Sequence, residues 1–304
     1  MFKKTRPRYA ALAFGRRKFP QVPRSSLAID QIIENYSNVD KIVTQNSKVS
    51  SIGSCFAEEI LLWMKQNNFN VIDPAWGMVY NPKNIRLIIE SGLEYDSFNP
   101  TERFWDFGDG DIRSPYVKSS KELTPIRLGS TIEEAKSNEA KLFKQFGDVL
   151  KNVETLIITL GQTEYWATEK QYPFYAAPWI GIKDGDKNHK PYNLSQQEVK
   201  DELNKTIKLL KKHNPNINIL ISVSPVPLVA SILEGNSAYI AAGRAKSTLH
   251  SATLEVVDDW DKVYYMPSYE IVTSKPESAF KPDGRHVLAS TVSNIMQTFK
   301  KLFT

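Results

Sequence analysis

The sequence is poor in the residues and runs that define several protein classes. Its 304 residues include one cysteine and no run of 18 apolar residues. A single cysteine excludes an intramolecular disulfide framework and fits a reducing compartment, so the chain is predicted to be cytoplasmic. Without a long apolar run, no membrane-spanning segment is expected. Hydrophobic residues make up 41% and charged residues 24% of the chain, which is typical of an ordinary globular protein and not of a disordered or collagen-like one.

The motifs of metal and nucleotide sites are also missing. The sequence contains no Cys-x-x-Cys or His-x-x-x-His spacing of the kind that holds a metal ion. The segment Gly108-Asp-Gly-Asp111 lies in a polar stretch and lacks the strand-to-helix context of a dinucleotide-binding loop. The sequence therefore predicts neither a metal nor a cofactor.

Acidic residues are absent from the first 24 positions, which carry eight lysines and arginines. Because the whole chain has a formal net charge of +5, the rest of it is slightly acidic. We therefore predict a basic N-terminal arm over residues 1–30, which either covers the protein's own surface or contacts an acidic partner. Nucleic-acid binding is not favoured, because the folded body lacks a basic surface. No apolar stretch of the length that a secretory signal needs follows the charges.

Apolar segments alternate with amphipathic ones along the remainder of the chain. The segments expected to form strands are residues 48–53, 71–72, 153–161, 217–223 and 263–266. Those expected to form helices are residues 56–69, 83–91, 131–151, 195–213, 246–260 and 286–303. This alternation predicts an α/β fold, a three-layer α/β/α sandwich with a mainly parallel central sheet. Residues 31–304 are expected to form one domain, interrupted by insertions at about 97–130 and 165–193.

The unusual residues follow the predicted strands. Gly53-Ser54-Cys55 follows the first strand, Gly161-Gln-Thr-Glu164 the central one, and Ser224-Pro225 the next. Ligands of parallel α/β sheets bind at the carboxyl ends of the strands. The sequence therefore predicts a site at that edge of the sheet.

The two insertions are rich in aromatic residues. Such long connections in compact domains are often functional. Two interpretations are open: the aromatic side chains anchor the insertions on the body, or some of them form a sugar-binding wall over the site.

The turn around Cys55 is a candidate catalytic element. A cysteine at the start of a helix faces backbone N–H groups, which favour its thiolate and can also stabilise an oxyanion on a bound carbonyl. Ser54 offers a competing hydroxyl nucleophile in the same turn. The alternative is that Cys55 is a small buried filler, as lone cysteines often are.

A possible base lies near the C-terminus. In Asp283-Gly-Arg-His286 the carboxylate can orient the imidazole, and the order nucleophile, acid, histidine is that of a catalytic triad. The alternative is a solvated histidine at the start of a helix. Among the other histidines, His189 is a reserve base, His213 is expected to be structural at a helix end, and His250 is a further candidate.

Several motifs together resemble the GSCFA family, and they occur in order over roughly residues 45–300. They are Gly53-Ser-Cys-Phe-Ala57, Thr159-Leu-Gly-Gln-Thr-Glu-Tyr-Trp166, Asn214-Pro-Asn with Ser222-Val-Ser-Pro-Val-Pro-Leu228, Ala245-Lys-Ser-Thr-Leu249 and Pro267-Ser-Tyr-Glu270. This family looks like a branch of the SGNH, or GDSL, hydrolases. The resemblance implies a flavodoxin-like three-layer fold and a catalytic site built on a Gly-Asp-Ser turn.

The resemblance also implies roles for particular residues. Cys55 falls on the nucleophile, Gly77 is a candidate for the oxyanion-hole glycine, and Thr163 replaces the oxyanion-hole asparagine. Asp283 and His286 match the final acid and base. Ser54, Gly161 and Glu164 are expected to line the same pocket. The substrate-binding candidates are Tyr80, Asn81, Trp166, Trp179 and Lys246.

Three functions are compatible with these features. The first is an esterase or acyltransferase that forms a thioester on Cys55, with a small acyl or carbohydrate-type substrate. The second is a binding module for a carbohydrate or an acyl carrier on a degenerate hydrolase scaffold. The third is an interaction protein that docks through its basic arm.

Overall fold

The computed structural model describes residues 41–74, 76–118, 124–175, 189–274 and 279–304. Two compact units divide the chain. The larger comprises Val43–Tyr269, and the smaller combines the N-terminal residues up to Ile42 with Glu270–Thr304. The predicted basic arm lies outside the described residues, and the predicted domain boundaries remain a prediction.

The larger unit is built on a parallel four-stranded sheet. Its strands, in spatial order, are β1 (Val49–Gly53), β5 (Thr155–Leu160), β8 (Asn218–Val223) and β9 (Val263–Met266). All residues of β1 and β5 are buried. Continuous burial explains why the central segments read as unbroken apolar runs, since both faces of the sheet are covered.

The strand order identifies the point where ligands bind in folds of this type. Val71, predicted as part of a short strand, forms a parallel bridge with Val49 of β1. Counting that bridge, the order along the sheet is the second, first, third, fourth and fifth strand segment, which is the flavodoxin-like order. Its switch point lies between β1 and β5, so a ligand is expected at the carboxyl ends of these two strands.

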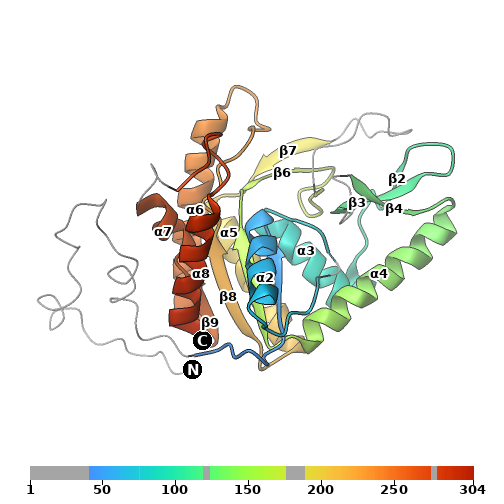
Figure 1. Cartoon of the computed structure of the whole chain (residues 1–304). Coiled ribbons are helices and arrows are strands. Elements are labelled where there is room, and N and C mark those ends of the chain that lie inside the picture. Colours follow the sequence, from blue (N-terminus) through green and yellow to red (C-terminus); the bar gives the residue numbers. More distant parts are fainter. Residues whose placement is uncertain (1–40, 75, 119–123, 176–188, 275–278) are drawn as a thin grey trace, which may run out of the picture. The chain divides into compact units, whose positions relative to one another are not determined.

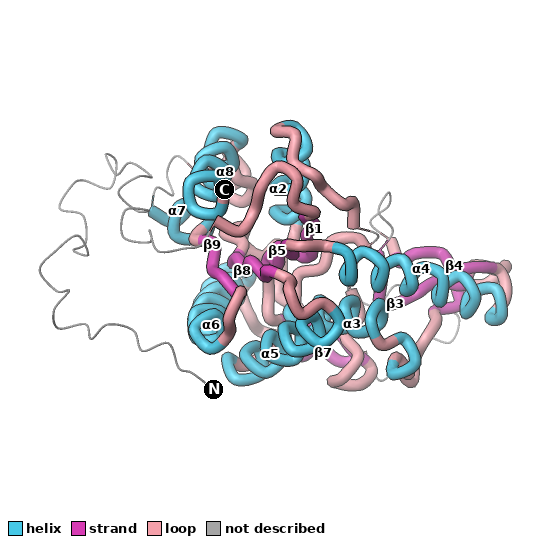
Figure 2. Tube along the Cα trace, turned by 90° about the horizontal axis from the view of Figure 1, so that it is seen from below, coloured by secondary structure: helices cyan, strands magenta, loops and turns pink. Residues whose placement is uncertain are grey.

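Helices cover both faces of this sheet (Figure 2). One face carries α2 (Cys55–Gln66). Along the other lie α3 (Pro82–Leu93), α5 (Gln196–His213) and α6 (Ala238–Asp259), with α4 (Ile132–Asn152) packed against α3. The predicted α/β fold with a parallel central sheet and helices on both sides is therefore confirmed.

The two predicted insertions contain small sheets of their own (Figure 1). A short 3₁₀ turn, η3 (Tyr95–Ser97), leads into the first, which holds the antiparallel strands β2 (Trp105–Asp106), β3 (Ile112–Lys118) and β4 (Pro125–Gly129). The second contains the hairpin β6 (Glu164–Ala167) and β7 (Lys190–Asn193). The sequence of these segments shows turn-forming and aromatic residues but does not predict the sheets, because pairing between strands depends on long-range contacts.

Most of the described aromatic residues of these segments anchor them on the body. Phe98, Trp105 and Tyr116 are almost fully buried. Phe98 makes edge contacts with Tyr116 and with Phe143 of α4, at centroid distances of 5.3 and 5.2 Å. These buried rings cannot stack on a sugar, so for them the anchoring interpretation is the right one.

The smaller unit contains α8 (Ala289–Phe303), and α7 (Ser268–Ser274) crosses the boundary between the units. The predicted last helix starts three residues too early. Lys281 N–H donates to the His286 carbonyl at 2.7 Å, and Gly284 adopts a φ of 67°. This turn occupies the residues before Leu288, which caps α8.

Helix α6 starts earlier than predicted. The helix begins at Ala238, eight residues before the expected start, and Ser237 caps it by accepting from the N–H of Tyr239. Gly243 inside the helix and the exposed side chains of Tyr239 and Ile240 hide this first part from a search for apolar periodicity.

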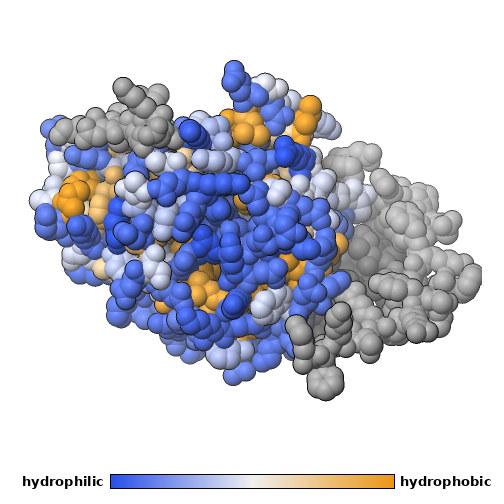
Figure 3. All heavy atoms as spheres, turned by 180° about the vertical axis from the view of Figure 1, so that it is seen from behind, coloured by the Kyte–Doolittle hydropathy of each residue, from blue (hydrophilic) through white to orange (hydrophobic). Residues whose placement is uncertain are grey.

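Among the described residues, few large apolar side chains are exposed. In the view from behind (Figure 3), hydrophilic residues predominate and apolar ones form separate small patches. Within the part of the chain that the structure describes, no helix combines the length and the apolarity needed to cross a membrane.

Candidate active site at the carboxyl edge of the sheet

Cys55 lies where the sequence predicts, in the turn between β1 and α2. Gly53 ends the strand with a φ of 142°, and a Cβ built there would lie 2.2 Å from the Thr159 carbonyl oxygen. Ser54 is the N-cap residue, and Cys55 is the first residue of the helix. The close approach of β5 therefore requires glycine, and it brings the helix N-terminus directly onto the switch point.

Ser54 is bound into the fold rather than free to react. Its N–H donates to the Thr159 carbonyl at 3.2 Å, and its hydroxyl lies 2.9 Å from the Thr159 hydroxyl. Its exposed fraction is 2%, whereas Cys55 is partly exposed. Of the two candidate nucleophiles, Cys55 is therefore the accessible one.

The environment of Cys55 holds its thiol protonated. Burial raises the pKa of the thiol above its ordinary value, and the Glu58 carboxylate raises it further. The backbone N–H of Phe56 and the charge of Lys246 lower the pKa, but they do not outweigh burial. The helix N-terminus alone therefore does not bring the pKa of this thiol below its ordinary value.

The segment 76–81 brings further predicted residues to this edge. Val79 N–H donates to the Gly53 carbonyl at 2.8 Å, and Gly161 N–H donates to the Tyr80 carbonyl at 2.8 Å. Gly77, two residues before Val79, packs against the backbone of Lys118. The structure thus brings Val79 and Tyr80 to the ends of β1 and β5, beside Gly161, and places Gly77 two residues further along this segment.

Lys246 reaches the same place from α6. Its Nζ donates to the Gly161 carbonyl at 2.6 Å, and the residue is 5% exposed. Burial lowers the pKa of Lys246 to about 7, while the Cys55 sulfur acts in the opposite direction. The predicted substrate-binding candidate is therefore a buried amine close to the thiol.

Thr163 and Glu164 use their side chains within the fold. In the amide orientation that satisfies its neighbours, Asn193 donates to the Thr163 hydroxyl at 2.6 Å and accepts from Arg244 at 3.1 Å. The Glu164 carboxylate accepts from the Ser231 hydroxyl and the Ile232 N–H, both at 2.8 Å. These contacts connect the β6–β7 hairpin with the segment before α6.

The other substrate-binding candidates differ in their surroundings. Asn81 is buried and caps α3 by accepting from Lys83 N–H at 2.9 Å. Tyr80 is partly exposed and directs its hydroxyl toward the Met78 sulfur at 3.7 Å. Trp166 is partly buried, and its indole N–H has no partner among the described residues. Trp179 lies outside the described residues.

Asp283 and His286 form the predicted pair. Nδ1 of His286 lies 2.6 Å from Asp283 Oδ2, and Oδ1 accepts from the N–H groups of Arg285 and His286 at 2.9 Å each. The hydrogen bond to His286 and these backbone contacts lower the pKa of Asp283. Because Nδ1 is bonded to the carboxylate, Nε2 is the ring atom left to exchange a proton.

The remaining histidines have other contacts. His189 Nε2 lies 2.8 Å from a Glu102 oxygen, among Trp105 and Phe174. His213 Nε2 lies 3.2 Å from Glu94, as expected for a structural residue at the end of α5. His250 packs against the rings of Tyr265 and Tyr269.

One neighbour of the site was not among the predicted residues. Lys118, at the end of β3, is 8% exposed; burial lowers its pKa, while Glu58 and the Cys55 sulfur raise it. It comes from the first insertion, and no local signal distinguishes it from other lysines. Only the packing of the β2–β4 sheet brings it near Cys55.

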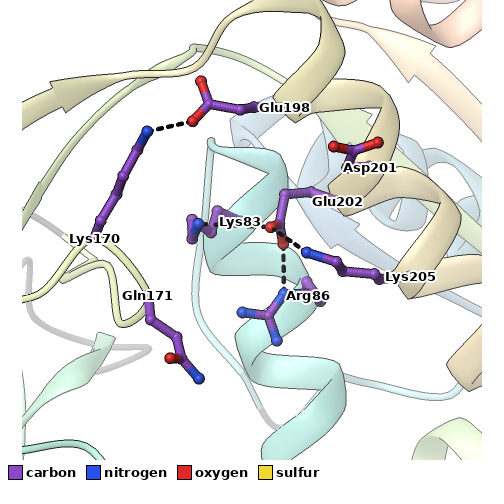
Figure 4. Close-up of a pocket in the computed structure, with 8 residues that line it drawn as sticks. All are labelled: Lys83, Arg86, Lys170, Gln171, Glu198, Asp201, Glu202 and Lys205. Carbon is purple, nitrogen blue, oxygen red and sulfur yellow. Dashed lines mark hydrogen bonds and ion pairs between the residues drawn. The ribbon is translucent and has the colours of Figure 1, made fainter.

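A second charged region lies between α3 and α5 (Figure 4). It is a cleft of about 460 Å³ lined by Lys83, Arg86, Lys170, Gln171, Glu198, Asp201, Glu202 and Lys205. The Glu202 carboxylate accepts a hydrogen bond from Arg86 Nε. It also lies 3.5 Å from Nζ of Lys83 and 3.3 Å from Nζ of Lys205. Cys55 does not line this cleft, which is built on α3 and α5 and not on the turn after β1. No cluster of three metal-ligating side chains occurs among the described residues.

Comparisons with known proteins identified a family and similar structures. A family model described as the GSCFA family matches residues 48–299. A search of curated proteins found no match. Two carbohydrate esterases are similar in structure. One is a family 3 carbohydrate esterase of Clostridium thermocellum (11% identity, 84% of this chain and 94% of that chain, TM-score 0.35). The other is a family 2 carbohydrate esterase with a carbohydrate-binding domain from Corynascus thermopiles (Myceliophthora fergusii). It is 12% identical, and the match covers 84% of this chain and 64% of that chain with a TM-score of 0.34.

Proposed function

The chain belongs to the GSCFA family, and from this premise we propose that it is an SGNH-like esterase or acyltransferase with Cys55 as its nucleophile. One observation carries the proposal. Cys55 is the partly exposed first residue of a helix that starts at the switch point of the sheet, while the neighbouring hydroxyl of Ser54 is buried and hydrogen-bonded. Nucleophiles of acyl transfer need both access and nearby N–H donors.

In this reaction the sulfur attacks the carbonyl carbon of an ester. The N–H groups of the first turn of α2, with that of Gly77 as a candidate, stabilise the oxyanion. Expulsion of the alcohol leaves a thioester on Cys55, which water or an acceptor hydroxyl then cleaves. The pair of Asp283 and His286 is proposed to transfer protons at the leaving and entering oxygen atoms, with Nε2 as the exchanging atom.

The acyl acceptor or donor is proposed to be a carbohydrate or glycoconjugate. This part rests on the family resemblance, on the partly exposed Tyr80 beside Gly161, and on the partly buried Trp166 of β6. A panel of acetylated and deacetylated oligosaccharides, followed by mass spectrometry, tests it. Acetate release or transfer to one of them supports the proposal, and turnover restricted to simple aryl esters contradicts the carbohydrate assignment.

Turnover of 4-nitrophenyl acetate by the full chain tests the nucleophile. Cys55→Ala is expected to abolish turnover and the acetyl adduct on the tryptic peptide that contains residue 55. Lys144→Met, at an exposed position on α4, is the control and keeps both. Full turnover by folded Cys55→Ala would show that Cys55 is not the nucleophile.

A binding module remains the second candidate, and one observation favours it. Burial raises the pKa of the Cys55 thiol, and the Thr163 hydroxyl is already bonded to Asn193, so neither residue is activated by its surroundings alone. Saturable binding of an oligosaccharide by Cys55→Ala, together with no turnover by the wild type, would favour this candidate. Binding of an acidic partner through residues 1–30 stays a separate proposal, and deletion of those residues tests it.

A further inference from the structure

Lys246 is an unusual group for the interior of a protein. Its side chain leaves α6 and reaches the end of β5, where Nζ donates to the Gly161 carbonyl at 2.6 Å. The residue is 5% exposed, and no carboxylate among the described residues is paired with it. A buried lysine without a counter-ion is costly, because desolvation penalises its charged form.

The register of the sheet places this amine beside the thiol. Gly53 of β1 pairs with Thr159 of β5 in parallel. Cys55 and Gly161 each lie two residues beyond this pair, so they leave neighbouring strands at the same edge. The electrostatic effect of Lys246 on Cys55, and of the sulfur on Lys246, agrees with this proximity.

The other charged groups around the thiol are either exposed to water or face an opposing charge. Glu58 and Glu59 are exposed on α2, and both raise the pKa of the Cys55 thiol. Burial lowers the pKa of Lys118, from β3, but the Glu58 carboxylate acts in the opposite direction as an opposing charge. Lys246 has no such charge apart from the sulfur, and burial leaves its amine largely unprotonated slightly above neutral pH.

We propose that Lys246 is the proton acceptor for Cys55, held in place by the Gly161 carbonyl. This inference rests on the proposed function, because it needs Cys55 as the nucleophile. It assigns the proton of the thiol to a residue of the same unit and leaves the pair of Asp283 and His286 to the oxygen atoms of the substrate.

The step is balanced within the site. As the S–C bond forms, the S–H bond breaks, its proton moves to Nζ, and the carbonyl π pair moves to oxygen. Collapse of the tetrahedral intermediate re-forms the carbonyl and breaks the C–O bond. The leaving alkoxide takes its proton from Nε2 of protonated His286, as proposed above, and the Lys246 ammonium releases its proton to water and returns to the amine. A base whose pKa lies close to the working pH is the most effective one for such a transfer.

Two variants of Lys246 separate the proton acceptor from a positive charge or a structural anchor. Lys246→Met keeps the length of the side chain without the amine. Lys246→Arg keeps the charge and the donors, but a guanidinium does not release its proton. For each, we would measure kcat/KM for 4-nitrophenyl acetate from pH 5.5 to 9, iodoacetamide alkylation of Cys55 at pH 8, and thermal melting. This ester suits the test because its phenolate leaves without protonation.

Wild-type kcat/KM is expected to rise with pH around neutrality. Both variants should lose roughly 100-fold, the size typical of general-base catalysis, and should lose that rise. In Lys246→Arg, Cys55 should still be alkylated at least as fast as in the wild type, because the cation remains. Lys144→Met is expected to match the wild type in all three measurements.

Three results would overturn the inference. The first is a folded Lys246→Met that retains kcat/KM and its pH profile while Cys55→Ala is inactive, which would leave the proposed function intact. The second is loss of the rise near neutrality in His286→Ala but not in Lys246→Met. The third is Lys246→Arg with wild-type turnover, which would mean that the charge alone matters. Should Lys246→Arg not fold, Lys246→Met and His286→Ala decide the question.

Discussion

The cleft between α3 and α5 and the carboxyl edge of the sheet both keep charged side chains away from water, but they balance the charge differently. In the cleft, Glu202 is bonded to Arg86 and lies within ion-pair distance of Lys83 and Lys205. At the carboxyl edge, the buried Lys246 is bonded to a carbonyl oxygen and faces a thiol.

The pKa values of Glu202 and Lys246 reflect this difference in charge balance. Burial acts to raise the pKa of Glu202, but the charges of Arg86 and Lys83 outweigh burial and hold that pKa below its ordinary value. For Lys246, no carboxylate opposes burial, and the pKa falls to about 7. A compensated buried charge contributes to architecture, whereas an uncompensated one beside a nucleophile is available for chemistry.

The largest expected effect comes from breaking the balance in the cleft. Glu202→Gln leaves Lys83 without its partner and Arg86 with Glu90 alone, so we expect a loss of about 3 kcal/mol in the free energy of unfolding at pH 7. Denaturation in urea measures this loss. Because the pKa of Glu202 is lowered in the fold, its stabilising contribution should fade as the pH falls below about 4.

Asp148→Asn is the matched control, since it breaks an exposed ion pair with Lys144 on α4. The expected loss is below about 0.5 kcal/mol. Equal losses for Glu202→Gln and Asp148→Asn would show that burial of the cleft cluster has no energetic importance.

At the carboxyl edge, the largest expected effect comes from the backbone. Gly53→Ala would place a Cβ 2.2 Å from the Thr159 carbonyl oxygen at a φ of 142°, so we expect a loss of about 2–3 kcal/mol. Gly108→Ala has a φ of 86° but meets no atom within 4 Å, and should lose about 1 kcal/mol. Urea denaturation of both variants measures the difference, and equal losses would mean that the close approach of β5 does not constrain the turn.

The lowered pKa of the Lys246 amine should change how the free energy of unfolding depends on pH. The pKa of Lys246 is lowered from 10.5 to about 7 on folding, so the unfolded chain binds more protons above pH 7 and wild-type stability rises with pH. From pH 7 to 9 this rise should be roughly 2 kcal/mol larger than in Lys246→Met. Above pH 9 the raised pKa of Cys55 acts in the opposite direction. Parallel stability curves for the two proteins would contradict the lowered pKa.

The smallest expected effect concerns the carboxylate beside the thiol. Glu58 raises the pKa of Cys55, so Glu58→Gln should lower it and increase the alkylation rate at pH 8 by about twofold, an effect screened by 0.5 M salt. Glu133→Gln, in the first turn of α4, is the control and should leave the rate unchanged. A slower reaction in Glu58→Gln would contradict the proposed electrostatics of the site.

Local signals in the sequence predicted much of this structure. The helix predicted over residues 195–213 is α5, which begins with a capping box of Ser195 and Glu198. The strand over 263–266 has the predicted bounds, and the turn at Cys55 lies between a strand and a helix as expected. Sequence patterns succeed here because apolar periodicity and capping depend on residues that are close in the chain.

Other features depended on contacts between distant segments. The insertions contain small sheets, because β2, β3 and β4 pair with one another and their aromatic residues pack against α4. The hydroxyls of Ser54 and Thr163 were predicted in the site but are bonded to Thr159 and Asn193. When the hydrogen-bond partner of a hydroxyl lies 30 or more residues away in the sequence, no pattern of neighbouring residues indicates it.

The sequence by itself determined the alternation of strands and helices, the family and the glycine–serine–cysteine turn, since each is written in neighbouring residues. Tertiary structure alone decided which charged groups meet at the turn. Lys246 comes from α6 and Lys118 from β3, and parallel pairing of β1 with β5 creates the edge where they approach Cys55. The physical reason is desolvation: a lysine becomes an amine near neutral pH only when the packed chain removes water from it and supplies no opposing charge.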